Sequence, residues 1–475
     1  MRLTRRAFGA AIAAGYAIPA SFALAQTSTA RLRADVTAAL KRAATFYHDR
    51  VAVHGGYGYY SSVDLQQRWG EGRLDPQSIV VQPPGTPTVG EAYLKAFAAT
   101  RDAFYLDAAR DAALALVEGQ LQSGGWTQVI DFVPHKQSGN YRTRRGGSRN
   151  SSSLDDNQTQ SALKLLMHAD QALEFKHAQI REAAKIGLDA LLKAQFLIGA
   201  FPQVWTGPVS AQPAKRAHYP DYDWRSEGRL KEYWNYYTLN DGLAGTVAEV
   251  LIEAERVYGD VRYLAALVKL GEFLLAAQMP DPQPGWCQQY NYEMVPIWAR
   301  KFEPPAVTGW ESQDVMETLI RIGRHTGEKR FLEPIPRAIA YFRGSLLADG
   351  RVARYYELRT NKPLYMDESY QLTYDADAAP KHYGWTQAAR FDVIEQAYES
   401  AQRGEVVEQL KDVEALARQA QEIVAALDDE GRWISKFAGE PLVGQPKFPA
   451  GFEYLSSAIF SRNVETLSAY LTATA

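Results

Sequence analysis

The sequence is poor in cysteine and carries almost no net charge. Its 475 residues include one cysteine, Cys287, so no disulfide can form within the chain and the fold must be held by its apolar core. The 52 lysines and arginines nearly balance the 55 aspartates and glutamates, which excludes nucleic-acid binding by overall charge. Hydrophobic residues make up 46% and charged residues 23%, which is typical of a globular protein rather than of a disordered or polytopic membrane protein.

Common nucleotide and metal motifs are also missing. The chain has no Walker A loop, no zinc-type spacing of cysteine and histidine, and no dinucleotide fingerprint placed after a predicted strand. The protein classes that depend on these motifs are therefore excluded.

Residues 1–25 predict an export signal of the twin-arginine type. An arginine pair at 5–6 precedes an apolar stretch at 9–24, and small residues at 23–25 suit a signal peptidase. The stretch is short for a membrane span and contains a glycine and a proline. We therefore expect a periplasmic or secreted chain, with no stable membrane insertion after signal removal and one catalytic domain over 26–475.

A helical repeat organises the rest of the chain. Two helices and a glycine-containing turn recur, for example helices expected over 315–325 and 329–347 before the last turn, and the turns fall at 124–128, 199–203, 284–288 and 350–354. Within the helices apolar residues recur at i, i+3 and i+4, whereas alternation of period two is largely missing. If the last helix (about 455–471) pairs with the first (about 34–47), six hairpins close into an all-α fold, an α/α toroid with short Gly-aromatic strands between hairpins.

Acidic residues recur where the inner helices of this toroid begin. Asp156 and Asp241 hold equivalent positions, and Glu311 follows Trp310 at the next helix start. Inner helices run in one direction, so their N-termini gather around one cleft. Two carboxylates that meet there favour a hard cation such as calcium, although such residues also cap helices. Asp156 and Asp241 are the candidate metal ligands, and Asn240, Trp310 and Glu311 are candidate substrate contacts.

The loops that we expect around this cleft are basic and aromatic. Residues 135–149 contain five lysines and arginines, Arg145 among them, with no acid, and 216–237 mix basic residues with tyrosine and tryptophan. Aromatic faces stack on sugars and guanidinium groups bind carboxylates, which suits an acidic polysaccharide. Nucleic acid would want the same features, but export and the balanced charge argue against it. A solvated loop without a ligand is the alternative for 135–149.

Five segments, in this order, resemble the pectate lyases of polysaccharide lyase family 10, and the resemblance spans about 124–385. They are Leu154-Asp155-Asp156-Asn157-Gln158-Thr159-Gln160, Tyr237-Thr238-Leu239-Asn240-Asp241-Gly242, Gly285-Trp286-Cys287-Gln288-Gln289, Trp298-Ala299-Arg300-Lys301-Phe302-Glu303-Pro304-Pro305 and Val352-Ala353-Arg354-Tyr355-Tyr356-Glu357-Leu358.

The resemblance implies a toroid-type fold and calcium-assisted β-elimination of polygalacturonate or a related polyuronate. It implies that Asp156 and Asp241 hold the metal and the substrate carboxylate, and that Arg300 stands at the arginine taken to be the catalytic base. An arginine base needs a lowered pKa, because guanidinium ordinarily stays protonated. A charged Arg300 would instead clamp the uronate carboxylate.

Two further basic residues are candidates for substrate binding. Arg354 follows the fourth glycine turn, so its repeat position points to the same end of the toroid. Its alternative role is that of a surface arginine packed on aromatic side chains. Lys381 stands where the family usually carries an arginine, and this departure affects the expected subsite contacts.

Two other functions stay open from the residues alone. One is a non-catalytic periplasmic protein that binds acidic oligosaccharides. The other is a toroid glycoside hydrolase that uses Asp156 and Asp241 as paired carboxylates. In each case we expect a monomer.

Overall fold

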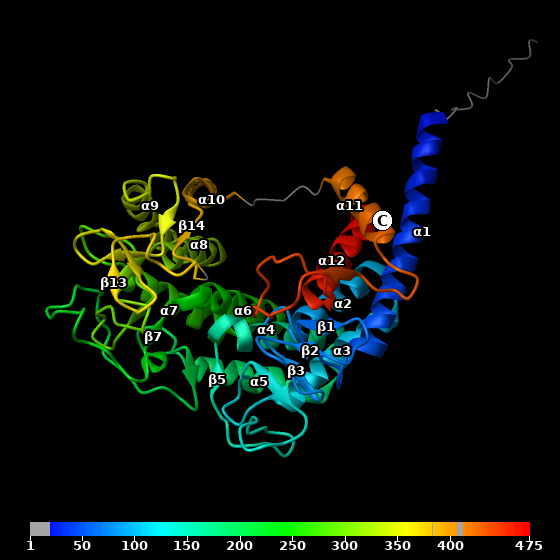
Figure 1. Ribbon diagram of the computed structural model, residues 1–475, viewed down its shortest axis with the longest axis horizontal. Coiled ribbons are helices and arrows are strands. Elements are labelled where there is room, and N and C mark those ends of the chain that lie inside the picture. The colour runs from blue at the N-terminus through cyan, green and yellow to red at the C-terminus, as the bar shows by residue number, and fades with distance from the viewer. Residues whose placement is uncertain (1–19, 382, 406–411) are drawn as a thin grey trace, which may run out of the picture.

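The computed structural model describes residues 20–381, 383–405 and 412–475, and this part of the chain contains twelve α-helices. Six of them form an inner row and six lie outside it, as the toroid prediction requires (Figure 1). The inner helices are α2 (Thr86–Thr100), α4 (Gln158–Ala172), α6 (Leu243–Tyr258), α8 (Gly309–Thr326), α10 (Phe391–Arg403) and α12 (Ser457–Ala473). The outer helices are α1 (Ala20–Phe46), α3 (Ala103–Gly119), α5 (Ala178–Lys193), α7 (Val261–Ala277), α9 (Ile335–Arg343) and α11 (Val413–Ala425).

The inner helices form an arc that is open at one place. They pack side by side in the order α12, α2, α4, α6, α8 and α10. The last helix, α12, packs against the first, α1, as predicted, but α11 packs against α12 and α1 whereas α10 packs against α8 and α9, so among the described residues α10 and α11 do not pack together as a hairpin. Figure 1 shows the opening between these two helices. The α/α toroid is confirmed, and it is open on this side.

Short strands lie next to the N-termini of the inner helices. Strand β5 precedes α4, β7 precedes α6, β9 precedes α8 and β16 precedes α12. The strands are β1 (Tyr60–Ser62), β2 (Arg68–Trp69), β3 (Ser78–Val80), β4 (Val129–Asp131), β5 (Ser152–Ser153), β6 (Val204–Trp205), β7 (Tyr237–Thr238), β8 (Gln289–Tyr290), β9 (Ala306–Thr308), β10 (Val352–Ala353), β11 (Tyr355–Glu357), β12 (Pro363–Met366), β13 (Leu372–Thr373), β14 (Thr386–Gln387), β15 (Ile434–Lys436) and β16 (Glu453–Ser456).

These strands pair in small antiparallel sheets. The pairs β3 with β4, β5 with β6, β7 with β8 and β10 with β14 stand alone, while β13-β12-β11-β9 and β15-β16-β1-β2 form four-stranded sheets. Because the strands cluster at one end of the helices, they hold the loops that enter the inner helices close together.

The repeat has a physical basis in the tryptophan that two of the glycine turns contain. Trp126 and Trp286 are fully buried, and their indole nitrogens donate to the carbonyls of Leu116 and Leu274, each at 2.8 Å. Both carbonyls lie in the last turn of an outer helix, where no backbone N–H is free to pair with them. The turn therefore provides a hydrogen-bond donor to the end of one helix, and the chain then continues to the next helix.

A glutamine at the end of three outer helices repeats a second contact. Gln120 donates to the carbonyls of Gly124 and Ala183, and Gln195 donates to those of Gly199 and Ala266. Gln278 bonds the carbonyls of Pro284 and Pro334 in the same way. Each glutamine thus ties its own turn to the next outer element, which sets the spacing of the hairpins.

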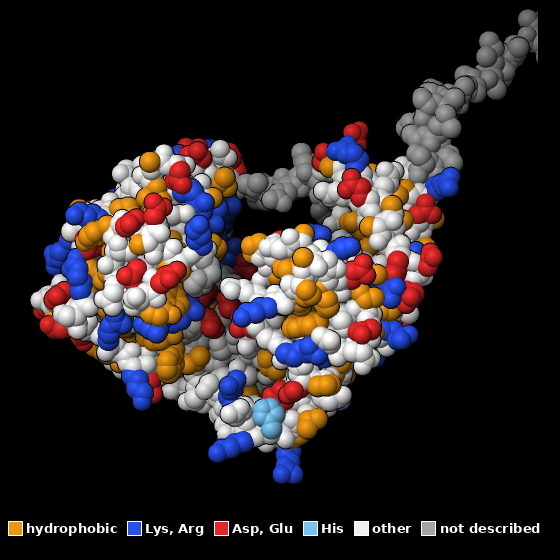
Figure 2. Space-filling model, in the orientation of Figure 1, with side chains coloured by type: hydrophobic (Ala, Val, Ile, Leu, Met, Phe, Trp, Pro, Cys, Tyr) orange, Lys and Arg blue, Asp and Glu red, His pale blue; other side chains and the backbone are white. Residues whose placement is uncertain are grey.

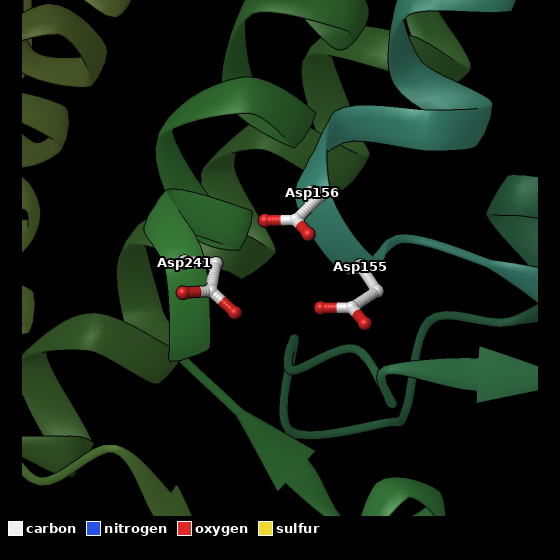
Figure 3. Close-up of side chains that lie close together, drawn as sticks. All are labelled: Asp155, Asp156 and Asp241. Carbon is white, nitrogen blue, oxygen red and sulfur yellow. The ribbon is translucent and has the colours of Figure 1, made fainter. Parts of the chain in front are cut away.

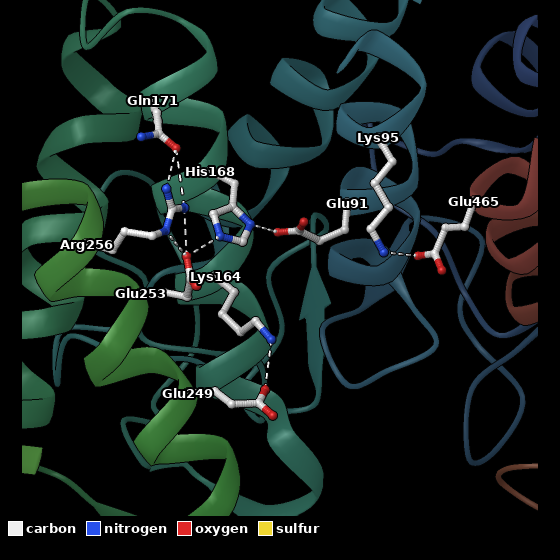
Figure 4. Close-up of polar contacts among 9 residues, drawn as sticks. All are labelled: Glu91, Lys95, Lys164, His168, Gln171, Glu249, Glu253, Arg256 and Glu465. Atoms are coloured by element: carbon white, nitrogen blue, oxygen red, sulfur yellow. Dashed lines mark hydrogen bonds and ion pairs between the residues drawn. The ribbon is translucent and has the colours of Figure 1, made fainter. Parts of the chain in front are cut away.

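Polar side chains line part of the inner row (Figure 4). His168 of α4 lies between two neighbouring helices, with Nδ1 2.7 Å from Glu91 Oε1 of α2 and Nε2 3.1 Å from Glu253 Oε2 of α6. One turn earlier, Lys164 donates to Glu249 at 2.9 Å. These side chains border a cavity of about 790 Å³ between α4, α6 and α8. The ion pairs between these side chains connect adjacent inner helices at a place where their contact is not fully apolar.

Some element bounds differ from the sequence expectations. The first helix begins at Ala20 rather than near residue 34, and the helix expected from 315 begins at Gly309. The helix expected over 329–347 divides into a 3₁₀ turn (Lys329–Leu332) and α9, because Pro334 and Pro336 interrupt it. Of the predicted export signal at 1–25, residues 1–19 lie outside the described residues. None of the described helices is long and apolar enough to cross a bilayer.

His168 generates a prediction about stability and pH. Burial lowers its pKa, but the hydrogen bonds and charges of Glu91 and Glu253 raise that pKa above the ordinary value overall. The stabilisation is therefore fully present below the unfolded pKa of about 6.5 and is lost as pH rises through the folded pKa. We expect His168→Gln to lower the free energy of unfolding by about 2 kcal/mol at acidic pH and by less in alkaline solution, as measured by urea denaturation.

Lys95→Gln is the matched control. Its partner Glu465 lies 2.7 Å away on α12, but both side chains are more than one third exposed, so the substitution should cost less than about 1 kcal/mol. An equal loss for His168→Gln at both pH values would contradict the account.

Candidate functional site

Two equivalent turns place acidic side chains at the starts of α4 and α6. Each follows a short strand as a 3₁₀ turn, Asp155–Asn157 before α4 and Asn240–Gly242 before α6. Asp156 has φ 43° and Asp241 has φ 52°, and the residue after each is also left-handed, with φ 62° at Asn157 and 70° at Gly242. The left-handed conformation costs a non-glycine residue about 1–2 kcal/mol. Both turns adopt it at the same place, and such strain is common at functional sites.

These aspartates do not cap the helices that they precede. The capping residues are Asn157 for α4 and Gly242 for α6, and neither helix start has a capping bond from a side chain. The hydrogen bonds of the two carboxylates go elsewhere, from Gln82 to Asp156 at 3.1 Å and from Asn240 to Asp241 at 2.5 Å. The geometry therefore leaves the carboxylates available to a ligand.

A third carboxylate completes the cluster (Figure 3). One oxygen of each of Asp155, Asp156 and Asp241 lies within 4.8 Å of the other two. All three side chains face the same space, two from the start of α4 and one from the start of α6. Oxygen donors at this spacing fit a hard cation such as calcium, which takes several oxygen ligands in irregular geometry. The side-chain oxygen of buried Asn240 has no partner among the described residues and adds a further oxygen donor next to Asp241.

The cluster is electrostatically costly without a cation. Burial and the neighbouring charges of Asp155 and Glu71 raise the pKa of Asp156 to about 6, against a lowering effect of Arg300. Burial and the charges of Asp156 and Asp155 raise the pKa of Asp241 to about 8. A bound cation would offset this repulsion, so the charge of the donor set agrees with its geometry.

Gln82 holds Asp156 in position. It is 5% exposed, and its amide nitrogen donates to Asp156 Oδ2 at 3.1 Å and to Glu71 Oε1 at 3.0 Å. Its amide oxygen accepts from Gln128 at 3.2 Å and from Gln158 at 3.3 Å. Because both its amide nitrogen and its amide oxygen are hydrogen-bonded, Gln82 fixes the orientation of the Asp156 carboxylate.

Arg300 is held as a cation by a buried glutamate. Its Nε lies 2.9 Å from Glu303 Oε2 and its Nη2 lies 2.7 Å from Glu303 Oε1, while Glu303 is 1% exposed. Burial lowers the pKa of Arg300, but the hydrogen bonds and charge of Glu303 raise it above its ordinary value overall. The arginine side chain remains 46% exposed, so this fixed positive charge is open to a ligand.

Arg354 is the second guanidinium near the cluster. Its Nε donates to Tyr355 at 3.2 Å, and its guanidinium lies 4.6 Å from the centre of the Tyr383 ring. The Tyr383 hydroxyl donates to Glu303 at 3.2 Å, so this ring links the surroundings of Arg300 and Arg354. Arg354 also lowers the pKa of Asp241, which opposes the effect of the neighbouring acids.

The predicted substrate contacts divide into two groups. Asn240 and Glu311 lie at the cluster, and Glu311 is fully buried with both carboxylate oxygens unpartnered among the described residues. Trp310 is 43% exposed at the start of α8. Arg145 and Lys381 lie apart from the aspartates. Arg145 lines a cavity with His135 and Lys136, and Lys381 lines another.

Four residues of this arrangement are absent from the sequence prediction of the site: Asp155, Gln82, Glu303 and Tyr383. Two of them could have been found from the sequence, because Asp155 adjoins Asp156 and Glu303 follows Arg300 by three residues, just before a pair of prolines. Gln82 and Tyr383 lie far from the motifs in the sequence and reach the site only through the fold.

The site lies in a hollowed part of the molecule. Figure 2 shows a deep cleft between the two arms of the arc, with acidic side chains visible inside it. Helices α4 and α6, whose starts carry the cluster, stand in the middle of the inner row. The acidic cluster therefore lies midway along the inner row.

Comparison with known proteins gives a family match and several similar structures. A family model described as pectic acid lyase matches residues 120–353. The family 10 polysaccharide lyase from Cellvibrio cellulosa is 19% identical, with a TM-score of 0.46 over 66% of this chain and 96% of that one. A mutant of it in complex with trigalacturonic acid is 18% identical, with the same TM-score, over 67% and 98%. A GH76 α-mannanase from Bacteroides thetaiotaomicron is 11% identical, with a TM-score of 0.43 over 92% and 96%.

The comparison with curated proteins finds no match. The range matched by the family model contains the three clustered aspartates, Arg300 and Glu303, and Arg354 follows it directly. Residues 120–353, just under half of the chain, are therefore similar to the pectic acid lyase family.

Proposed function

We propose that this lyase cleaves polygalacturonate, or a closely related polyuronate, by calcium-assisted β-elimination in the periplasm or outside the cell. One observation carries the proposal: three carboxylates within 4.8 Å of one another share a cleft with two guanidinium groups whose charges act on them. Carboxylates that hold a cation, together with arginines, suit a polymer whose every unit carries a carboxylate. The pectic acid lyase family supports the same substrate class.

The cation and the arginines would have different roles in catalysis. Asp156 and Asp241 would hold calcium, with Asp155 beside them, and the bound ion would neutralise the uronate carboxylate next to C5 and so make the C5 proton more acidic. Arg300 binds the same carboxylate and stabilises the enolate-like charge as it develops, and Arg354 binds a carboxylate along the chain. Gln82 would keep the Asp156 carboxylate in the orientation that binds the ion.

The elimination balances as a proton loss and a bond cleavage. A base takes the C5 proton, the C4–O4 bond breaks, a C4=C5 double bond forms, and the departing O4 gains a proton. Glu303 raises the pKa of Arg300, so we propose that Arg300 acts as the carboxylate clamp rather than as the base. A water molecule in the cleft accepts the C5 proton.

The first test is the formation of the unsaturated product. Purified protein with polygalacturonate and calcium should give rising ultraviolet absorbance, which a chelator abolishes and added calcium restores. Arg300→Ala should lower kcat/KM at least about 100-fold, and the exposed position of Arg300 leaves the fold intact. Binding without product would indicate an oligosaccharide-binding protein instead. New reducing ends without the unsaturated bond would indicate a hydrolase.

Glu303→Gln separates the two possible roles of Arg300. The substitution keeps the shape of the side chain but removes the charge that raises the arginine pKa. If Arg300 clamps the substrate, loss of its buried partner should misplace it and lower kcat about 10-fold. An increase in kcat at neutral pH would contradict the clamp, because a lower pKa helps only an arginine that acts as a base. Glu293→Gln, at an exposed glutamate outside the site, is the matched control and should leave kcat unchanged.

A further inference from the structure

A second cavity adjoins the arginine pair. Its volume is about 690 Å³, and its wall includes Phe302, Met366, Tyr370, Tyr383 and Trp385. Phe302 comes two residues after Arg300, and Tyr383 is the ring that links the surroundings of Arg300 and Arg354. The cavity therefore lies next to the site described above, and Tyr383 belongs to the surroundings of both.

The aromatic wall of this cavity is a packed unit. The Phe302 and Tyr383 rings meet edge to face at 4.9 Å, and Tyr383 meets Trp385 in the same way at 4.8 Å. The Arg300 guanidinium lies 5.1 Å from the centre of the Phe302 ring. One side of this wall thus contacts the guanidinium groups, and the cavity opens on the other. An aromatic lining of this kind suits the apolar face of a sugar ring.

The polar groups of the cavity differ from those of the arginine site. Its lining contains Asp367, Glu368 and Asp377 but no arginine. Asp367 accepts the backbone N–H groups of Ser369 at 2.8 Å and Gln371 at 2.9 Å, so it shapes the loop. Within the described part of the chain, the carboxylates of Glu368 and Asp377 make no hydrogen bond or ion pair. Two unpaired acceptors therefore border an aromatic surface.

Two lysines bring positive charge to the same place. The Lys301 ammonium lies 3.9 Å from the centre of the Tyr370 ring and is engaged there. Lys381 lines the cavity and is exposed. The three carboxylates of the lining outnumber these two lysines, and no arginine lines the cavity. A uronate carboxylate would be repelled here, whereas sugar hydroxyls can donate to the free carboxylates.

We propose that this cavity is a subsite for an uncharged pyranose, next to the uronate held at Arg300. The proposal rests on the proposed function, because the cleft must bind a uronate polymer for its neighbouring unit to enter the cavity. The occupant is either a neutral sugar or a uronate whose carboxyl is methyl-esterified, since both present hydroxyls and an apolar ring face without a charge. The favoured substrate thus carries at least one uncharged unit beside the cleaved bond.

The test compares three polymers on the full-length enzyme with calcium. They are unesterified polygalacturonate, partly methyl-esterified polygalacturonate, and a backbone in which neutral sugars alternate with uronates. The double variant Glu368→Gln/Asp377→Asn keeps the side-chain shapes and removes both charges. The measured quantity is the ratio of kcat/KM on unesterified polygalacturonate to kcat/KM on the better of the other two polymers. We expect this ratio to be at least about fivefold higher in the double variant than in the wild type. Which of those two the wild type cleaves faster identifies the occupant.

Asp429→Asn/Glu453→Gln is the matched control. These two exposed acids do not line the cavity, and removing them changes the net charge equally, so the ratio should stay within about twofold of the wild type. An unchanged ratio in the Glu368→Gln/Asp377→Asn variant would overturn the proposal. So would a fall in its kcat/KM on polygalacturonate, because that result means that the two carboxylates help to bind a charged unit. Absence of unsaturated product from all three polymers would instead contradict the proposed function.

Discussion

Mutual repulsion of three carboxylates is the constraint on which the rest of the structure depends. Asp155, Asp156 and Asp241 would separate in a flexible chain, because each raises the cost of charge on the others. They stay together because each of the two turns is fixed between a paired strand and an inner helix. The left-handed conformations at Asp156 and Asp241 are tolerated for the same reason: the surrounding fold determines the turn more strongly than local preference does.

The basic half of the site follows a different design. Arg300 is fixed by a glutamate that is itself buried, so its charge is stabilised rather than suppressed. This arrangement provides a rigid cation that faces anionic groups. It also places Tyr383 so that the two arginines and the aromatic wall of the adjoining cavity share one ring. Residues 300–303 therefore contribute both to the charge at the site, through Arg300 and Glu303, and to the wall of the cavity beside it, through Phe302.

The sequence alone carries much of this fold. Helical periodicity and the recurring glycine turns predict the hairpins, and the equivalence of Asp156 and Asp241 follows from their places in the repeat. The opening between α10 and α11 could not be predicted, because it depends on which helices α11 packs against and not on any local pattern. The helix expected over 329–347 is shorter than its apolar pattern suggests because of its prolines.

The site was predictable where its residues lie in local motifs. Arg300 and both repeat aspartates have such motifs, but the partner that fixes the charge state of Arg300 became clear only from the paired geometry with Glu303. Gln82 reaches Asp156 across 74 positions of sequence, and Tyr383 reaches Glu303 across 80. Contacts of this range depend on how the elements of the toroid pack in space, and local sequence spacing does not predict them.

The most direct test of the central claim is a crystal structure with calcium and an oligogalacturonate that the Arg300→Ala variant binds without cleavage. The account predicts one calcium ion bound by Asp156 and Asp241 at about 2.3–2.6 Å, with a substrate carboxylate completing its coordination. An ion bound elsewhere, or a substrate carboxylate seated in the cleft with no ion between these aspartates, would contradict it.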